Sequence, residues 1–91
     1  MSLMKKVISE HARFELARRQ LTEEMVIAVV ANPGQTLETE RGRTVYQTRY
    51  FDASVKRDML LRVVCEHGQD SITVIPAYRT SKIEKYWEQE G

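Results

Sequence analysis

Two arginines occupy apolar, strand-like stretches in the second half of the chain, where an unpaired charge would be costly. Arg62 lies inside the run MLLRVV, and Arg79 directly follows the run SITVIPAY. A buried guanidinium needs a carboxylate, water or an anionic ligand as its partner. Two interpretations of Arg62 therefore stay open: an ion pair with an acid such as Glu66 or Glu84, and a contact with a phosphate group.

The pairing of the last two predicted strands places both arginines on one face of a sheet. If His67–Asp70 form a four-residue turn, Cys65 lies opposite Ile72, and side chains alternate between faces from there. One face then carries only apolar or aromatic side chains: Met59, Leu61, Val63, Cys65, Ile72, Val74, Pro76 and Tyr78. The other face carries both arginines among Leu60, Val64, Thr73, Ile75 and Ala77. The arginines would stand roughly 13 Å apart, a spacing that could hold two successive phosphates.

Two further side chains could handle protons beside these arginines. Tyr78 belongs to the apolar set, but it stands at the end of its strand, where its hydroxyl could reach the mouth of a cleft. His11 opens a predicted helix and faces Glu15, which makes it the candidate histidine for acid or base chemistry. The alternatives are core packing for Tyr78 and a surface or capping role for His11. The candidate catalytic set is Arg62, Arg79, His11 and Tyr78.

A second set of basic and aromatic residues could extend this surface along a nucleic-acid strand. Single-stranded nucleic acid is held by aromatic stacking together with cationic contacts. The candidate RNA-binding residues are Arg43, Tyr46, Arg49, Lys82 and Lys85. The alternative is that these charges are solvated and bind nothing.

The strand that contains Tyr46 can present either of two faces. A tight pairing of Phe51 with Met59 puts Tyr46, Thr48 and Tyr50 on the arginine face. A one-residue bulge in DASVKRD would replace this set with Val45, Gln47, Arg49 and Phe51. We favour the tight pairing.

The sequence does not indicate other kinds of site. A single cysteine excludes an internal disulfide, and two histidines without paired cysteines do not make a structural zinc site. Cys65 falls in the apolar set with no base near it in the sequence, so we do not expect it to act as a nucleophile. Neither a phosphate-binding loop nor paired carboxylates at a defined spacing is visible. We therefore expect no metal and no cofactor.

Two helices are predicted in the first third of the chain. A short strand over Lys5–Ile8 is followed by Ser9, a residue suited to cap a helix. In that helix Phe14, Ala17 and Leu21 form an apolar stripe at positions i, i+3 and i+7. The second helix begins after its cap Thr22, with Glu23 and Glu24 in its first turn, and ends at NPG.

Four strands are predicted to follow, because the apolar period changes to two. They are QTLETE, TVYQTRYF, MLLRVVCE and SITVIPAY, joined by short turns. The sequence SKIE then matches a capping box that starts a short C-terminal helix at Ser81. The predicted fold is α+β, with two N-terminal helices packed on one face of a four-stranded antiparallel meander and a short C-terminal helix. The short N-terminal strand is an optional addition to this sheet.

Length and composition describe one ordinary globular domain. The chain has 91 residues, 30% of them charged, and a formal net charge of +1, so any nucleic-acid role must come from a local patch. We assign the domain to residues 4–89 and treat residues 1–3 and 90–91 as expression-vector remnants. Because we find neither a leader sequence nor an apolar segment that could span a membrane, we expect the protein in the cytoplasm.

Several stretches resemble a family of small bacterial domains of unknown function. They are ISEHARFELARRQLTEEMVIAVVANPGQ, GRTVYQ, LLRVV and YRTSKIEKYW, and together they cover nearly the whole chain. That family is similar to the RelE/ParE-like toxins, including the BrnT-type members. The resemblance implies two helices packed on an antiparallel sheet, with a helix at the end.

The same resemblance implies an activity, which is metal-independent RNA cleavage by a toxin that an antitoxin protein neutralises. In such enzymes the 2′-hydroxyl attacks the adjacent phosphodiester, and cations stabilise the charge that builds on phosphorus. By position, Arg62 corresponds to the central-strand arginine of the family, and Arg79 with Tyr78 corresponds to the last-strand pair. Protons would be handled by His11 or Tyr78.

Two other functions fit the same scaffold. One is a binding or regulatory module without catalysis, which could form a homodimer through an exposed strand edge. The other is a ParE-like inhibitor that binds a protein target. The expected partners are therefore RNA, an antitoxin protein or a second copy of the chain, and a membrane is not among them.

Overall fold

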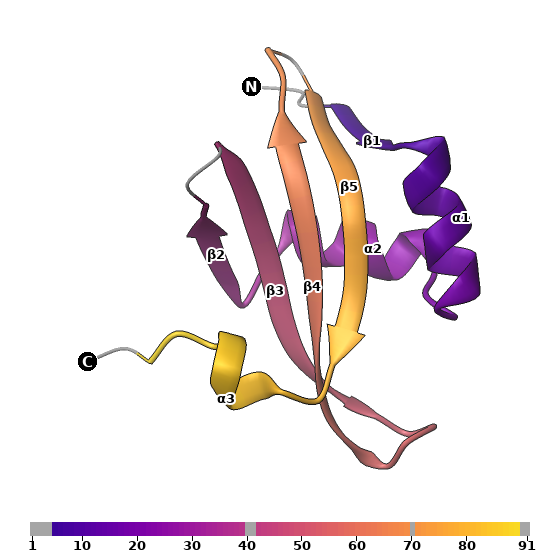
Figure 1. The fold of residues 1–91 in the computed structure, drawn as a ribbon, viewed down its shortest axis with the longest axis vertical. Helices are drawn as coiled ribbons and strands as arrows, with labels where there is room; N and C mark the ends of the chain where they lie inside the picture. Colours follow the sequence, from indigo (N-terminus) through magenta and orange to yellow (C-terminus); the bar gives the residue numbers. More distant parts are fainter. Residues whose placement is uncertain (1–4, 40–41, 70, 90–91) are drawn as a thin grey trace.

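Within the residues that the structure describes, 5–39, 42–69 and 71–89, five strands form one sheet and three short helices accompany it (Figure 1). In this computed structural model the elements are, in chain order, β1 (Lys5–Ile8), α1 (Glu10–Arg18), α2 (Glu23–Ala31), β2 (Gln35–Glu38), β3 (Arg43–Asp52), β4 (Arg57–His67), β5 (Ser71–Thr80) and α3 (Ile83–Tyr86). The predicted vector remnants lie outside the described residues. No helix in the described part has the length and apolar character to cross a membrane.

The sheet is mixed, because β1 pairs in parallel with β5 while the other neighbouring strands are antiparallel. The strand order is β1-β5-β4-β3-β2. The predicted four-stranded antiparallel meander is therefore wrong. Short turns reveal strands that pair with their neighbours in the sequence, whereas β1 pairs with the last strand, from which two helices and three strands separate it. This parallel edge is short, Lys5–Ile8 beside Ser71–Val74.

The helices begin as predicted but are not placed as predicted. The hydroxyl groups of Ser9 and Thr22 accept hydrogen bonds from the amides of Ala12 and Met25, each at 3.1 Å, so both predicted caps are confirmed. α1 lies along β5, whereas α2 crosses behind β3 and β4 (Figure 1). The prediction of two helices packed on a four-stranded meander is therefore replaced by helices that contact different strands of a five-stranded sheet.

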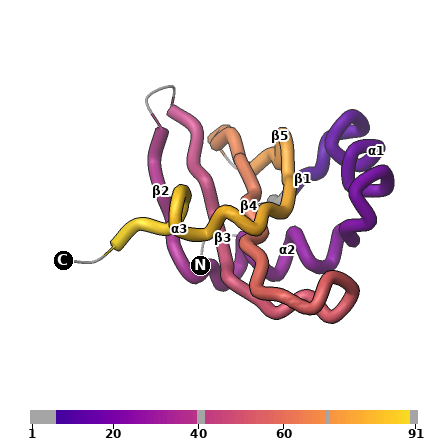
Figure 2. The backbone as a smooth tube through the Cα atoms, turned by 60° about the horizontal axis from the view of Figure 1, so that its bottom comes forward, coloured from indigo at the N-terminus to yellow at the C-terminus, as the bar shows by residue number. Residues whose placement is uncertain are grey.

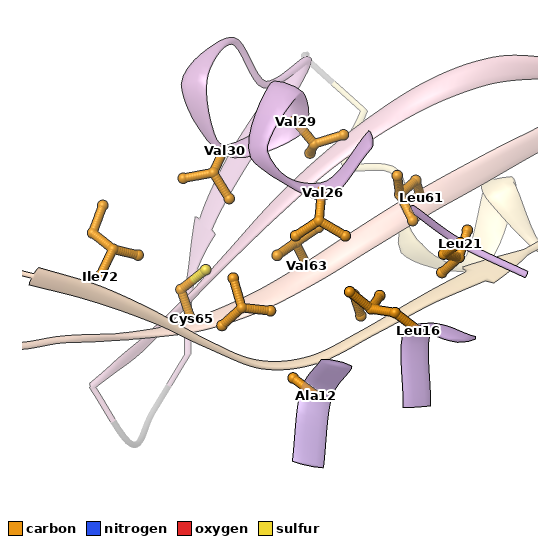
Figure 3. Close-up of a cluster of buried hydrophobic side chains, with 12 residues drawn as sticks. Ala12, Leu16, Leu21, Val26, Val29, Val30, Leu61, Val63, Cys65 and Ile72 are labelled. Carbon is orange, nitrogen blue, oxygen red and sulfur yellow. The ribbon is translucent and has the colours of Figure 1, made fainter. Parts of the chain in front are cut away.

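One hydrophobic core joins these helices to the sheet (Figure 3). Its buried members are Ala12, Leu16, Leu21, Val26, Val29, Val30, Leu61, Val63, Cys65, Ile72, Val74 and Ala77. All of its strand members come from β4 and β5, which lie in the middle of the sheet. We call this side of the sheet the helix face. Burial of its apolar side chains stabilises the fold by roughly 25 cal/mol per Å² removed from water.

The predicted apolar stripe of α1 is wrong. Phe14 is 63% exposed and Ala17 is also exposed, whereas the buried residues of the helix are Ala12 and Leu16. α1 ends before Gln20, which takes a left-handed conformation with φ of 58°. Leu21 therefore enters the core from the connection after the helix rather than from a continuous stripe.

α3 begins later than predicted. Its N-cap residue is Lys82 rather than Ser81, and no side-chain hydrogen bond caps the helix. The Lys82 amide donates to the hydroxyl of Thr80 at 3.1 Å. The predicted capping box at Ser81 is therefore wrong. A helix of four residues is not stable alone in water, so contacts with the sheet must hold it in place.

We predict that Leu16→Ala lowers the free energy of unfolding by about 2–5 kcal/mol, because it leaves a cavity at a side chain that is only 2% exposed. Phe14→Ala, on the same helix, should change the free energy by no more than about 0.5 kcal/mol. Urea unfolding followed by circular dichroism measures both. Equal losses from the two variants would contradict the observed burial of α1.

Candidate functional site

A β-bulge in β5 decides which side chains meet on each face of the sheet. Ile75 and Pro76 together oppose the single residue Val64, where the register with β4 shifts. Proline has no N–H to donate to a strand ladder and is therefore confined to strand edges and bulges. Cys65 and Val74, before the shift, face the core as predicted. Every residue of β5 after Pro76 points to the face opposite to the predicted one.

Arg62 and Arg79 consequently lie on opposite faces of the sheet. Arg62 pairs with Tyr78, and Arg79 pairs with Leu61; side chains of directly paired residues share a face. Because Leu61 is in the core, Arg79 lies on the helix face. Arg62 and Tyr78 lie on the other side, which we call the C-terminal face because α3 lies over it (Figure 1). The predicted arginine pair on one face, and the predicted place of Tyr78 on the apolar face, are both wrong.

Arg79 is held by an ion pair on the helix face. Its guanidinium donates to Oδ2 of Asp52 at 2.7 Å. Ser54 also donates to Asp52 through its hydroxyl and its amide, and Tyr50 through its hydroxyl. These hydrogen bonds, above all that of the Ser54 hydroxyl, hold the pKa of Asp52 below its usual value. Asp52 therefore stays ionised at neutral pH and neutralises the charge of Arg79.

The same aspartate stabilises the turn between β3 and β4. This turn determines which side chains of β3 lie on each face of the sheet. By accepting from the Ser54 amide, Asp52 closes a tight turn, which lies on the side of the molecule where α1 lies, away from α3 (Figures 1 and 2). Tyr50 then pairs with Met59, on the helix face. The favoured pairing of Phe51 with Met59 is wrong, and the alternative set is observed on the C-terminal face: Val45, Gln47, Arg49 and Phe51.

Arg62 is the centre of a polar network on the C-terminal face. Its Nε donates to Oε1 of Gln47 at 2.9 Å, and its NH1 donates to the hydroxyl of Tyr78 at 2.7 Å. The guanidinium carbon also lies 4.1 Å from the centre of the Tyr86 ring, a cation–π arrangement. The observed partners of Arg62 are thus neutral groups, and the predicted ion pair with Glu66 or Glu84 is not formed.

Two glutamines extend this network and fasten the C-terminal segment to the sheet. Gln47, which is fully buried, donates to Oε1 of Gln35 at 2.8 Å and to the Tyr86 carbonyl at 3.1 Å. Gln35 exchanges two hydrogen bonds with the backbone of Glu88, at 2.7 and 3.1 Å. Every side-chain polar group of Gln47 therefore has a partner, as burial requires. The C-terminal segment therefore covers Gln47 on this face of the sheet.

Beside this network the C-terminal face has a basic hollow of about 550 Å³. Its lining residues are Arg49, Ser81, Lys82, Ile83, Glu84 and Lys85. The Arg49 guanidinium lies 5.5 Å from the centre of the Trp87 ring, and the Lys85 ammonium lies 5.2 Å from that of Tyr86. We call this feature the basic hollow. It unites three of the five predicted RNA-binding residues, from β3 and from the segment around α3.

The other predicted site residues lie elsewhere. His11 is exposed on α1, and Glu15, its predicted neighbour, pairs with Arg18 and Arg19 instead. Arg43 is exposed at the first position of β3. Tyr46 lies on the helix face, not on the arginine face, and its hydroxyl is 3.0 Å from Nε2 of His67; desolvation raises the pKa of Tyr46.

Sequence reasoning missed the residues that hold the network together. Gln47 and Gln35 looked like ordinary polar positions of half-buried strands, and their roles depend on a segment about forty or more positions away in the chain. Trp87 offered a signal, because a lone tryptophan near a chain end is rarely left without a packing partner. In the described residues, no group of three His, Cys, Asp or Glu side chains could hold a metal ion.

We predict that Gln47→Ala lowers the free energy of unfolding by about 1–3 kcal/mol, because it removes a fully buried side chain that accepts from Arg62 and donates to Gln35 and to the Tyr86 carbonyl. It should also loosen the C-terminal segment, so the emission of Trp87, the single tryptophan, should shift to the red and be quenched more by acrylamide. Gln69→Ala, at an exposed turn, is the control. An unchanged Trp87 spectrum in Gln47→Ala would contradict the fastening role.

We predict that Cys65 is unreactive in the folded protein. The thiol is fully buried, and desolvation raises its pKa from 9.0 to about 11, so little reactive thiolate is present at neutral pH. Ellman's reagent at pH 8 should modify Cys65 only after unfolding in urea. Since the folded state keeps this proton longer than the unfolded state, stability should also fall as the pH rises from 9 towards 11. Rapid modification of the folded protein would contradict the prediction.

One known protein family matches most of this chain. A family described as "Domain of unknown function (DUF4258)" matches residues 8–79, which run from the last residue of β1 to the ninth residue of β5 and include Arg62, Tyr78 and Arg79. Neither a search of curated proteins nor a search of solved structures found a match. The chain therefore belongs to the DUF4258 family of domains of unknown function.

Proposed function

We propose that this protein is a binding module that holds single-stranded RNA at the basic hollow without cleaving it. The observation that carries the proposal is the meeting of Arg49 with Lys82 and Lys85 around one open hollow. These three cations come from two distant parts of the chain, β3 and the segment around α3, and all three are exposed. Basic side chains that line one groove are the electrostatic footprint of a phosphate backbone.

The charge of the hollow differs from that of the whole chain. Three cations and a single acid, Glu84, line it, whereas the chain as a whole has a net charge of only +1. Arg62, close by, has neutral partners and so adds a further positive charge to this face. The local patch that a nearly neutral protein would need for nucleic-acid binding is therefore present.

Aromatic rings lie next to two of the cations that line the hollow. The Arg49 guanidinium lies over the Trp87 ring, and the Lys85 ammonium, like the Arg62 guanidinium, lies over the Tyr86 ring. Bases of single-stranded nucleic acid stack on such rings, at about 1–3 kcal/mol per base, while nearby cations hold the backbone. A base that stacks on either ring would take the place of the cation over it, and that cation would then contact the phosphate backbone.

The geometry favours binding over cleavage. A nuclease of the expected kind needs several cations and a proton acceptor around one phosphodiester. Arg62 and Arg79 lie on opposite faces, Arg79 is neutralised by Asp52, and His11 is on α1. A RelE/ParE-like toxin activity, an antitoxin partner, a ParE-like protein target and a homodimer stay predictions, because no contact observed in the described residues favours them.

Titration of a fluorescein-labelled oligouridine tests the proposal. We expect Arg49→Ala, and the double variant Lys82→Ala/Lys85→Ala, each to weaken binding about tenfold or more at low salt. For single strands, each lost phosphate contact should reduce the slope of log K against log salt by about 0.7. Trp87 emission should change on binding in the wild-type protein, because the ring contacts Arg49, which lines the hollow.

The control is Arg43→Ala, which makes the same charge change on the same strand but at its far end, and it should bind as the wild type does. Equal weakening by Arg43→Ala and Arg49→Ala would show a nonspecific charge effect and reject the hollow as the site. Gel analysis of the incubated RNA separates the alternatives, since shortened RNA would reject the non-cleaving module.

A further inference from the structure

A second basic site lies at the end of α1, beside the last residues of β5. It is a pocket of about 490 Å³, and its lining residues are Arg18, Arg19, Gln20, Tyr78 and Arg79. This volume lies within the range of about 300–1,000 Å³ that is usual for small-molecule sites. Because three of the five lining residues carry a guanidinium group, the pocket suits an anionic ligand.

The protein itself orients two of these guanidinium groups. Arg79 donates to Asp52 at 2.7 Å, and Arg19 donates to the Ala77 carbonyl at 2.8 Å. A guanidinium has five N–H donors in a planar fork, so these contacts fix its direction and still leave donors for a ligand. Arg18, whose side chain is 65% exposed, can adjust its position to a ligand at little cost in stability.

The charges around the pocket do not cancel. Glu15 lies 3.2 Å from Arg18 and 3.5 Å from Arg19, and Asp52 pairs with Arg79. In the described part of the chain, three guanidinium groups thus share two carboxylates, and one positive charge is left over. Glu15, whose side chain is 16% exposed, divides its charge between Arg18 and Arg19, whose side chains are 65% and 41% exposed. Ion pairs of exposed arginines are weak and easily exchanged for a stronger anion.

The edge of β5 beside the pocket is accessible to a ligand but is unsuited to pairing with another strand. β1 pairs only with Ser71–Val74, so among the described residues no strand lies on the β1 side of β5 from Ile75 onward, while β4 pairs with its other side. Pro76 has no N–H to offer there, and the Ala77 carbonyl already accepts from Arg19. These features block the addition of a strand. They also leave the side chain of Tyr78 accessible at the rim of the pocket.

We propose that this pocket binds a phosphate monoester, the dianionic group found on free nucleotides and on the 5′ end of RNA. Arg18 and Arg79 donate to the phosphate oxygens, since the guanidinium fork matches phosphate geometry. The Tyr78 ring packs against the part of the ligand next to the phosphate. Arg49, Lys82 and Lys85 line a separate hollow. A failure of RNA to bind at that hollow would therefore not count against phosphate binding in this pocket.

Isothermal titration with adenosine monophosphate tests this site, with adenosine as the probe that lacks phosphate. We expect saturable binding of the monophosphate alone and a loss of about tenfold in affinity for Arg18→Gln, the usual effect of removing a charged hydrogen bond. The matched control is Arg13→Gln, because Arg13 is similarly exposed on α1 and pairs with Glu23 outside the pocket. It should leave the affinity unchanged.

Oligouridines with a 5′-phosphate or a 5′-hydroxyl distinguish the two sources of the ligand. They are titrated into an Arg49→Ala/Lys82→Ala/Lys85→Ala background, in which the basic hollow is disabled. A preference for the 5′-phosphate that Arg18→Gln abolishes would support the pocket and assign it to RNA ends. If neither adenosine monophosphate nor the 5′-phosphate binds, or if Arg13→Gln weakens binding as much as Arg18→Gln, the proposal is overturned.

Discussion

Pro76 cannot donate a hydrogen bond to the sheet, and β5 accommodates it with one extra residue. That residue turns over the end of the strand. Tyr78 then lies on the C-terminal face, where its hydroxyl accepts from Arg62, and Arg79 lies on the helix face, where Asp52 neutralises it. Without the bulge both arginines would project from one face, and Asp52, on the other face, could not reach Arg79. The bulge thus separates two basic regions that simple alternation would merge.

Asp52 also influences which side chains of the neighbouring strands share a face of the sheet. It accepts hydrogen bonds within the β3–β4 hairpin and also binds Arg79 from β5, so one side chain ties together the ends of three strands. The facing of β3 follows from this turn, and so does the exposure of Arg49 on the C-terminal face. The position of a cation in the basic hollow therefore depends on a carboxylate on the opposite side of the sheet.

Patterns among neighbouring residues predicted the helix caps and which side chains of a strand share a face. They did not predict which distant strands pair. The caps Ser9 and Thr22 were readable because a cap and its helix are adjacent in the sequence. The facing of Cys65 and Val74 was also readable, although the predicted partners were two residues out of register, because a shift of two preserves the face. A shift of one residue moves every later side chain of the strand to the other face. Pro76 was the visible sign of that shift, while the parallel pairing of β1 left no sign in its own residues.

Arg62 illustrates how structure and binding can share one residue. A half-buried guanidinium is expected to find a carboxylate, yet its partners here are an amide, a phenol and an aromatic ring. These contacts give partners to two of its five N–H donors without cancelling its charge, so the positive potential persists on the C-terminal face. The same contacts hold Tyr86, and through it the segment that carries Lys82 and Lys85. Arg62 is thus best understood as a positioning residue: it places the cations of the basic hollow and adds its own field to theirs, and it need not touch a bound strand to do so.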